Sequence, residues 1–336
     1  MHLFLLGDFV SSTGPGIANR QIKESLELKY NVNVLSNSKL DLLLNLYNQI
    51  KKNDVLIICS YSKVDYIAIK IAKILRKKIV YIMHGCVTYE KKMNNPSISS
   101  KKFKKIDKFE NYIFENVDKI ICVSKHFMNF MIEYKSVYKN KYDYIFNVVN
   151  VEKSNELIEK KIQVFSTGGG MIRKNNYKIA CSIEKAKLNL QYIIAGNELE
   201  DGYRLRGKKC VKWMDAISHD DVIKLMSESS LYLQNSKFET FGIAVIEALY
   251  CGCDILISNN VGCKDLFSNL TNDDIIFDED NEEQIGDKIK KLIKYGNNNR
   301  LMDGFLKEYI SQQWQANKIQ KIIGELIDVN NNYTNI

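Results

Sequence analysis

Short apolar runs alternate with longer amphipathic segments along almost the whole chain, and this alternation limits the folds that the sequence can adopt. The apolar runs at 3–6, 55–59 and 79–83 have the length of buried strands, and the segments between them have helical spacing. Strands that alternate with helices form parallel sheets, because each connecting helix covers a face of the sheet. The first half of the chain is therefore predicted to be an α/β domain.

The alternation pauses at 147–160, which is polar and charged, and restarts with a strand predicted at 162–166. A chain of 336 residues is long enough for two domains with separate cores. We expect the first domain at 1–150 and the second at 160–304, and we expect 305–336 to be largely helical. Two open α/β sheets in tandem predict a ligand in the cleft between them, at the carboxyl ends of the strands.

Positive charge is concentrated in the first half of the chain. The net charge is +8; residues 1–150 carry 24 Lys and Arg against 13 Asp and Glu (+11), whereas residues 151–336 carry 24 against 27 (−3). This asymmetry indicates an anionic partner, either a membrane surface or nucleic acid, or else a lysine-rich surface that is only solvated. The segment 91–112 has seven lysines among apolar residues. It fits a helix lying on anionic lipid or one packing on the sheet.

Cysteine spacing and hydropathy indicate the compartment. None of the eight cysteines forms a C-x-x-C pair, and several, such as Cys122, lie in apolar runs. This pattern argues against a zinc site or a redox dithiol. No apolar stretch reaches about 18 residues, and the first residues lack the charged start of a signal peptide. We therefore expect a reduced, cytoplasmic protein without a membrane span.

The string Phe-Glu-Thr-Phe-Gly-Ile-Ala-Val-Ile-Glu-Ala at 238–248 is the strongest chemical signal. Glu239 is predicted in a loop above a strand end, and Glu247 about one turn into the helix that follows. A helix N-terminus favours phosphate groups, and a carboxylate beside it can accept hydrogen bonds from ribose or sugar hydroxyls. Spacing alone leaves open a surface loop followed by a helix with an exposed glutamate.

The complete string resembles the E-x7-E motif of glycosyltransferase family 4, the retaining enzymes of the GT-B fold. The resemblance covers nearly the whole chain and is strongest at 160–265. It implies two Rossmann-like domains that face each other across a cleft, with the last helix crossing back to the first domain. The first domain would bind the acceptor, and the second would bind the nucleotide-sugar donor.

The resemblance also implies roles for residues of the string. Glu239 would lie by the donor sugar, and Glu247 would bind the ribose hydroxyls. The backbone of Phe241, Gly242 and Ile243 would cradle the donor sugar and its phosphates.

Arg173 and Lys174 follow a glycine loop after the strand predicted at 162–166. A diphosphate leaving group gains negative charge as the glycosidic bond breaks, and cations must stabilise it when no metal is bound. Lys174 resembles the lysine of the family. The family usually has an arginine where this chain has Gly169, so Arg173 would replace it by reaching back.

In the first domain, Gly16 lies in a glycine-containing loop after the first strand, and His84 ends another strand. The loop is not a G-x-G-x-x-G fingerprint, because its sixth position is Asn19. In the family, Gly16 would let the backbone approach the donor phosphates, and His84 would orient a sugar hydroxyl. A structural role for His84 is the alternative.

Gly168, Gly196 and Trp213 complete the candidate donor contacts. Gly168 and Gly196 end strands of the second domain, and the segment that contains Trp213 resembles the family segment that meets the nucleobase. Trp213 fits a core position equally well. The candidate catalytic residues are Glu239, His84, Lys174 and Arg173.

The resemblance implies a metal-independent, retaining glycosyltransferase that moves a hexose or N-acetylhexosamine from a nucleotide-diphosphate sugar. The resemblance favours UDP as the nucleotide. It also implies a lipid-linked glycan acceptor in the synthesis of a bacterial surface polysaccharide such as a capsule. The basic first half would contact the inner face of the plasma membrane. No nucleic-acid module supports the basic half as a nucleic-acid binder.

Two alternatives remain on the same fold, a nucleotide-sugar epimerase and a non-catalytic partner subunit. No cofactor beyond the nucleotide sugar is expected. No D-x-D pair lies at a strand end in the donor half, and the acidic residues at 273–274 and 278–280 are interpreted as solvated turns, so no metal is implied.

Overall fold

The computed structural model describes residues 1–11, 13–35, 42–150 and 159–331. The chain forms two compact units. Unit 1 consists of Met1–Tyr89, Ser97–Val148 and Lys307–Ile336, and unit 2 of Glu90–Pro96 and Val149–Leu306. Most of the linker predicted at 147–160 lies outside the described residues.

Within the described part of unit 1, six parallel strands form one sheet in the order β2-β1-β3-β4-β5-β6. They are β1 (His2–Leu6), β2 (Asn31–Val34), β3 (Val55–Ile58), β4 (Lys78–Met83), β5 (Lys119–Cys122) and β6 (Tyr142–Tyr144). β1 lies between β2 and β3, so the winding of the sheet changes direction beside β1.

The helices described in unit 1 are α1 (Gly14–Glu27), α2 (Leu42–Lys52), α3 (Lys63–Ile74), α4 (Val87–Asn94, which extends into the 90–96 segment of unit 2), α5 (Ser100–Asn116), α6 (Lys125–Tyr134) and α13 (Gln312–Asn331). α1 begins at Gly14 because Thr13 caps it: the Thr13 Oγ1 accepts from the Gly16 N–H at 3.3 Å. Pro15 fits the first turn, where its missing N–H leaves no helical bond unmade.

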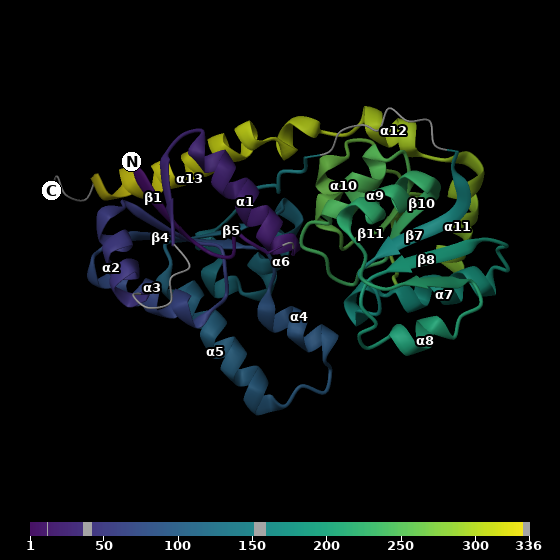
Figure 1. Cartoon of the computed structure of the whole chain (residues 1–336), viewed down its shortest axis with the longest axis horizontal. Coiled ribbons are helices and arrows are strands. Elements are labelled where there is room, and N and C mark those ends of the chain that lie inside the picture. The colour runs from purple at the N-terminus through teal and green to yellow at the C-terminus, as the bar shows by residue number, and fades with distance from the viewer. Residues whose placement is uncertain (12, 36–41, 151–158, 332–336) are drawn as a thin grey trace. The chain divides into compact units, whose positions relative to one another are not determined.

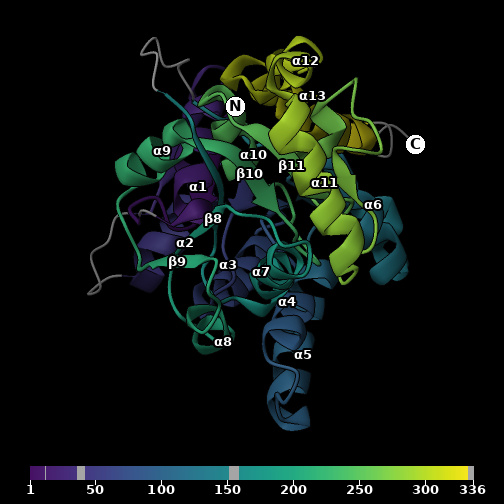
Figure 2. The ribbon, with the colours of Figure 1, turned by 90° about the vertical axis from the view of Figure 1, so that its right-hand side faces the viewer.

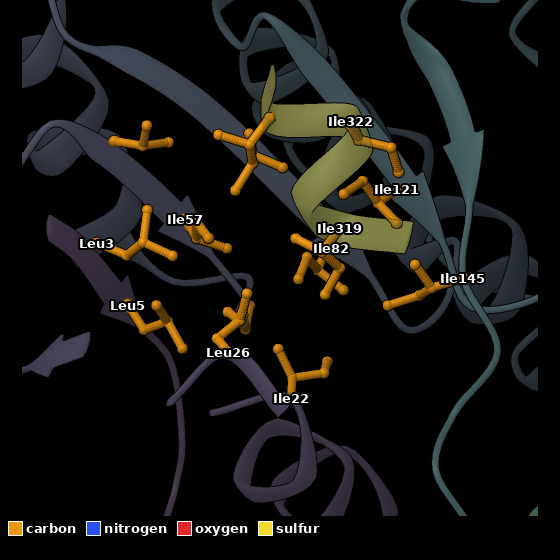
Figure 3. Close-up of a cluster of buried hydrophobic side chains, with 14 residues drawn as sticks. Leu3, Leu5, Ile22, Leu26, Ile57, Ile82, Ile121, Ile145, Ile319 and Ile322 are labelled. Carbon is orange, nitrogen blue, oxygen red and sulfur yellow. The ribbon is translucent and has the colours of Figure 1, made fainter. Parts of the chain in front are cut away.

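The last helix packs on unit 1, as the sequence predicts. α13 lies against α1 (Figure 1). Its buried side chains Ile319 and Ile322 join Ile22 and Leu26 of α1 in one apolar cluster over the sheet (Figure 3). Each such buried side chain stabilises the fold by about 1.5 to 3 kcal/mol. The helix begins at Gln312 instead of 305, because a short 3-10 turn precedes it.

Unit 2 has a second parallel sheet, whose described strands follow the order β12-β11-β10-β7-β8-β9. They are β7 (Lys161–Thr167), β8 (Gln191–Ala195), β9 (Val211–Met214), β10 (Ser229–Gln234), β11 (Asp254–Ser258) and β12 (Ile275–Ile276). The two parallel α/β sheets expected from the alternation are thus confirmed.

The helices described in unit 2 are α7 (Asn176–Lys185), α8 (Gly202–Arg206), α9 (His219–Glu228), α10 (Ile243–Tyr250), α11 (Glu282–Tyr295) and α12 (Asn298–Asp303). Ile179 and Ile183 of α7 are four residues apart and so share one helix face. Both are buried against strand residues such as Leu231. Figure 2 looks onto α11, which packs against α7 and β11. In the described part of the chain, no helix combines the length and apolar character that crossing a membrane requires.

Candidate active site

The topology of unit 2 brings the loops after β7 and β10 together. β7 lies between β8 and β10. The helix after β7 therefore leads to one edge of the sheet, and the helix after β10 leads to the other. Open parallel sheets bind ligands at such a switch point, at the carboxyl ends of the strands. Lys174 follows β7 and Glu239 follows β10, so the two predicted residues meet there.

The Glu239 carboxylate binds both predicted cations. Its Oε2 lies 2.5 Å from Lys174 Nζ and 3.2 Å from Arg173 Nη1. The same Arg173 nitrogen donates to the carbonyl oxygen of Phe238 at 3.0 Å. The side chain of Glu239 is only 12% exposed. Arg173 therefore reaches the carboxylate from a position after the glycine loop. Its Nε also lies 3.9 Å from Glu90 Oε2, so the two cations and two carboxylates of the cluster balance in formal charge.

The charges in this cluster determine one another's protonation. Burial opposes ionisation of Glu239, but the Lys174 and Arg173 charges overcome it and lower the pKa of Glu239 to about 2. Burial lowers the pKa of Lys174, and the attraction of Glu239 opposes that shift. Burial also opposes the charge of Arg173, whose pKa Glu239 nevertheless raises. Glu239 is therefore an anion at neutral pH.

Gly168 makes room for the Lys174 side chain. A Cβ on Gly168 would lie 2.8 Å from Lys174 Cγ, which is closer than real Cβ contacts allow. The φ of Gly168 is +97°, a conformation that favours glycine. The lysine stem therefore lies against the backbone of the loop, with its ammonium group on Glu239.

Glycines also hold the loops after β7 and β8 together. The N–H groups of Gly168 and Gly169 both donate to the Ala195 carbonyl, at 3.0 and 3.1 Å. A Cβ on Gly196 would lie 2.6 Å from the Gly169 nitrogen. The structure thus assigns the predicted contact residues Gly168 and Gly196 a role in backbone packing.

The start of α10 has the features of an anion site. Gly242 precedes the helix with a φ of +97°, and a Cβ there would lie 2.9 Å from Val261 Cγ1. Ile243 is the first helical residue, so the positive end of the helix dipole lies here. The buried Nε2 of Gln234 lies 3.6 Å from the same Cβ position. It has no hydrogen-bond partner among the described residues.

The segment before α10 is held by the loop after β11. The Gly262 N–H donates to the Glu239 carbonyl at 3.0 Å, and the Cys263 N–H donates to the Phe241 carbonyl at 2.6 Å. The Phe241 ring is buried in the core of unit 2. Of the string predicted to cradle phosphate, Phe241 therefore anchors this segment through its buried side chain.

Glu247 lies on α10, and its partner is a residue that the sequence analysis did not single out. Glu247 Oε1 lies 2.9 Å from Nε2 of His219, the first residue of α9. His219 stands 28 positions earlier in the chain, so no local spacing connects the pair.

Trp213 lies at the edge of the core of unit 2. Its ring is partly buried and packs against the core of unit 2. Its Nε1 donates to Asp215 Oδ1 at 3.1 Å, and the Arg206 guanidinium lies 5.0 Å from the ring. The ring thus combines a buried face with a polar edge.

The interpretation of the two acidic segments as solvated turns is correct for the exposed Asp278 and Asp280 but wrong for Asp274. Asp274 is completely buried, and Arg300 Nη2 binds its two carboxylate oxygens at 2.7 and 2.9 Å. The Glu279 carbonyl accepts from Asn175 Nδ2 at 2.8 Å and from Asn235 Nδ2 at 2.9 Å. Because Asn175 and Asn235 follow β7 and β10, Glu279 links the two loops that carry the cluster.

His84 and Gly16 lie in unit 1. His84 Nε2 lies 2.6 Å from Asn19 Oδ1, and burial lowers the pKa of His84 to about 4. A Cβ on Gly16 would lie 2.4 Å from Ser11 Oγ, and the Gly16 N–H donates to Thr13 Oγ1. Gly16 is thus required by the packing of its own loop, and that N–H is already used within it.

Two family models match consecutive parts of the chain. Residues 150–303 match the model described as glycosyl transferases group 1, and residues 18–153 match the model described as Glycosyltransferase Family 4. The chain belongs to glycosyltransferase family 4. No curated protein matches the sequence.

Solved structures share the fold of this glycosyltransferase at low identity. HepE from Anabaena, crystallised with UDP and glucose, is 16% identical with a TM-score of 0.68, and the match covers 98% of this chain and 100% of HepE. Sucrose-phosphate synthase from Thermosynechococcus elongatus is 13% identical with a TM-score of 0.67, over 98% and 100% of the two chains. WaaG, a glycosyltransferase involved in lipopolysaccharide biosynthesis, is 12% identical with a TM-score of 0.60, over 94% of each chain. The predicted GT-B fold class is thus confirmed.

Proposed function

We propose that this glycosyltransferase moves a hexose or N-acetylhexosamine from a UDP-sugar to a glycan acceptor, with retention of anomeric configuration. The observation that carries the proposal is the cluster in which Lys174 and Arg173 bind Glu239, three residues before Gly242 and the start of α10. Cations and a helix N-terminus at one place favour a bound diphosphate.

The chemistry of the step gives the two cations of the cluster a role. When the bond between the anomeric carbon and the diphosphate oxygen breaks, negative charge develops on the diphosphate. Lys174 and Arg173 stabilise that charge without a metal ion. Glu239 holds both cations in place and lies by the donor sugar.

The other candidates bind the rest of the nucleotide sugar. Glu247 accepts hydrogen bonds from the ribose, and the segment of Trp213 meets the base. The N–H groups at the start of α10, beginning with Ile243, bind the phosphates. His84 orients a sugar hydroxyl, because its neutral imidazole can donate one hydrogen bond and accept another. The HepE crystals with UDP and with UDP-glucose support a uridine donor.

We further propose that unit 1 binds a lipid-linked acceptor at the inner face of the plasma membrane, in surface polysaccharide synthesis. The exposed lysines of α5 support this: they are Lys101, Lys102, Lys104, Lys105 and Lys108. Basic side chains near an anionic surface contribute about 1 kcal/mol each to its attraction. The partly buried Phe103 and Ile106 lie between them.

The first experiment measures thermal stability with UDP, GDP, ADP and their common sugars. A ligand that binds only the folded state stabilises it by about 2.7 kcal/mol at a hundredfold excess over Kd. We expect a shift with UDP and UDP-sugars that Glu247→Ala removes. Glu283→Ala is the control, because it removes the same charge at an exposed position of α11. The absence of a shift with any nucleotide would contradict the proposed donor site and favour a non-catalytic partner subunit.

A turnover assay distinguishes the proposed transferase from a nucleotide-sugar epimerase. A transferase releases UDP in proportion to glycosylated acceptor, whereas an epimerase converts the nucleotide sugar without any acceptor. Conversion of purified UDP-sugar to its epimer would overturn the proposed transfer.

A further inference from the structure

The carboxylate of Glu247 is held from the neighbouring helix. Its Oε1 lies 2.9 Å from His219 Nε2, and α9 packs against α10. The side chain of Glu247 is 14% exposed, whereas that of His219 is 60% exposed. The histidine therefore reaches a sheltered carboxylate from the solvent side of the helix pair.

His219 projects from a well-defined helix start. Ser218 caps α9, with its Oγ accepting from the Asp221 N–H at 3.1 Å. The cap orients the first turn of α9, which carries His219. The position of the imidazole is therefore set by α9, independently of the loop that carries Glu239.

A single hydrogen bond on Oε1 has a specific effect on a glutamate. The terminal torsion of glutamate is broad, so an unrestrained carboxylate samples many orientations. A donor on Oε1 selects one orientation and leaves the lone pairs of Oε2 for a ligand. Adjacent ribose hydroxyls require two acceptor directions, which one oriented oxygen provides.

We propose that His219 is a positioning residue for the nucleotide, donating its Nε2 proton to Glu247 Oε1 so that Oε2 accepts from the ribose hydroxyls. This inference rests on the proposed function, in which Glu247 binds ribose. In this arrangement His219 acts on the ligand through Glu247 alone.

The test compares the affinity of the full-length protein for UDP in three variants. His219→Ala should raise the Kd for UDP about fivefold, the effect of losing one hydrogen bond of about 1 kcal/mol. His219→Gln should restore most of the affinity, because its amide also donates an N–H. Asp220→Asn, at the exposed neighbouring position of the same helix turn, should leave the Kd unchanged.

A second probe, 2′,3′-dideoxy-UDP, identifies the route of the effect. The loss caused by His219→Ala should disappear with this ligand, and it should also disappear in the Glu247→Ala background. An equal loss with both ligands, or tighter UDP binding by His219→Ala, would overturn the inference. Tighter binding by His219→Ala would mean that the histidine competes with ribose for the Glu247 carboxylate.

Failure of the proposed function gives a different pattern. If wild type does not bind UDP, or if Glu247→Ala binds UDP as wild type does, then the ribose contact is wrong and the inference falls with it. If Glu247→Ala weakens binding and His219→Ala does not, only the positioning role is wrong.

Discussion

His84 Nε2 lies 2.6 Å from Asn19 Oδ1, and the surroundings of Asn19 determine which ring nitrogen carries the proton. Asn19 Nδ2 donates to the carbonyl oxygens of Asp8 and Cys59, at 2.9 and 3.3 Å. The amide therefore presents its oxygen to the imidazole. Because that oxygen can only accept, neutral His84 carries its proton on Nε2 and its lone pair on Nδ1.

This neutral histidine should make stability depend on pH. Burial lowers the pKa of His84 to about 4, below its ordinary value of 6.5. Between these values the unfolded chain binds a proton that the folded protein does not, so stability falls as the pH drops from 6.5 to 4. We expect wild type to lose about 2 to 3 kcal/mol over this range that His84→Gln does not lose.

Urea unfolding of both proteins at pH 7 and pH 4.5 measures this difference. Glutamine keeps an N–H that can donate to Asn19, so His84→Gln removes the titration while preserving the hydrogen bond. An identical dependence on pH in both proteins would show that His84 is protonated as readily folded as unfolded.

Glu239 should also make stability depend on pH, because folding favours the charged form of its carboxyl group. Its folded pKa of about 2 lies below the ordinary 4.5 because Lys174 and Arg173 overcome the effect of burial. Its contribution is therefore present above pH 4.5 and is lost as the pH falls towards 2. We expect Glu239→Gln to lower the free energy of unfolding by about 3 kcal/mol at pH 7. The difference in free energy of unfolding between the variant and wild type should shrink at pH 4 and again at pH 3. A difference that stays constant with pH would contradict the lowered pKa of Glu239.

Lys174 should act on the diphosphate and not on the nucleoside. Lys174→Met removes a charge-assisted hydrogen bond, so we expect the Kd for UDP to rise about tenfold or more. The Kd for uridine should stay the same. Calorimetry with both ligands measures the two constants. Lys178→Met is the control, since Lys178 pairs with Glu282 at 2.9 Å, and equal effects of the two variants would count against a specific phosphate contact.

Gly168 should resist substitution for two separate reasons. An added Cβ meets Lys174 Cγ at 2.8 Å, and its φ of +97° strains any other residue. We expect Gly168→Ala to lower the free energy of unfolding by about 1 to 3 kcal/mol and to weaken UDP binding by displacing Lys174. In Gly14→Ala the added Cβ meets nothing within 4 Å, so thermal unfolding should change by only a few tenths of a kcal/mol. Equal losses in the two variants would show that neither reason applies.

The residues that sequence reasoning found share one property: their signals are local. Glu239 and Glu247 stand in one eleven-residue string, and Arg173 and Lys174 are adjacent behind a glycine loop. The structure brings three of them together, because Glu239 binds both cations. Glu247 pairs instead with His219 of α9.

The residues that sequence reasoning missed become partners only when the chain packs. Asn19 was noted only because it interrupts a fingerprint, yet it holds His84, which is 65 positions away. The buried Asp274 resembles an exposed turn residue in sequence. Its partner Arg300 follows 26 positions later on a different element, so no pattern in its neighbourhood predicts burial.

Hydrophobic periodicity and a contiguous motif lie in consecutive residues, so the α/β alternation, the two sheets and the family can be predicted from the sequence alone. Which side chains complete the site depends on how the elements pack. The order of strands around β7 sets which loops meet, and the packing of α9 on α10 sets which residue holds Glu247. Such pairings join residues far apart in the chain, and their geometry exists only once the helices have packed on the sheets.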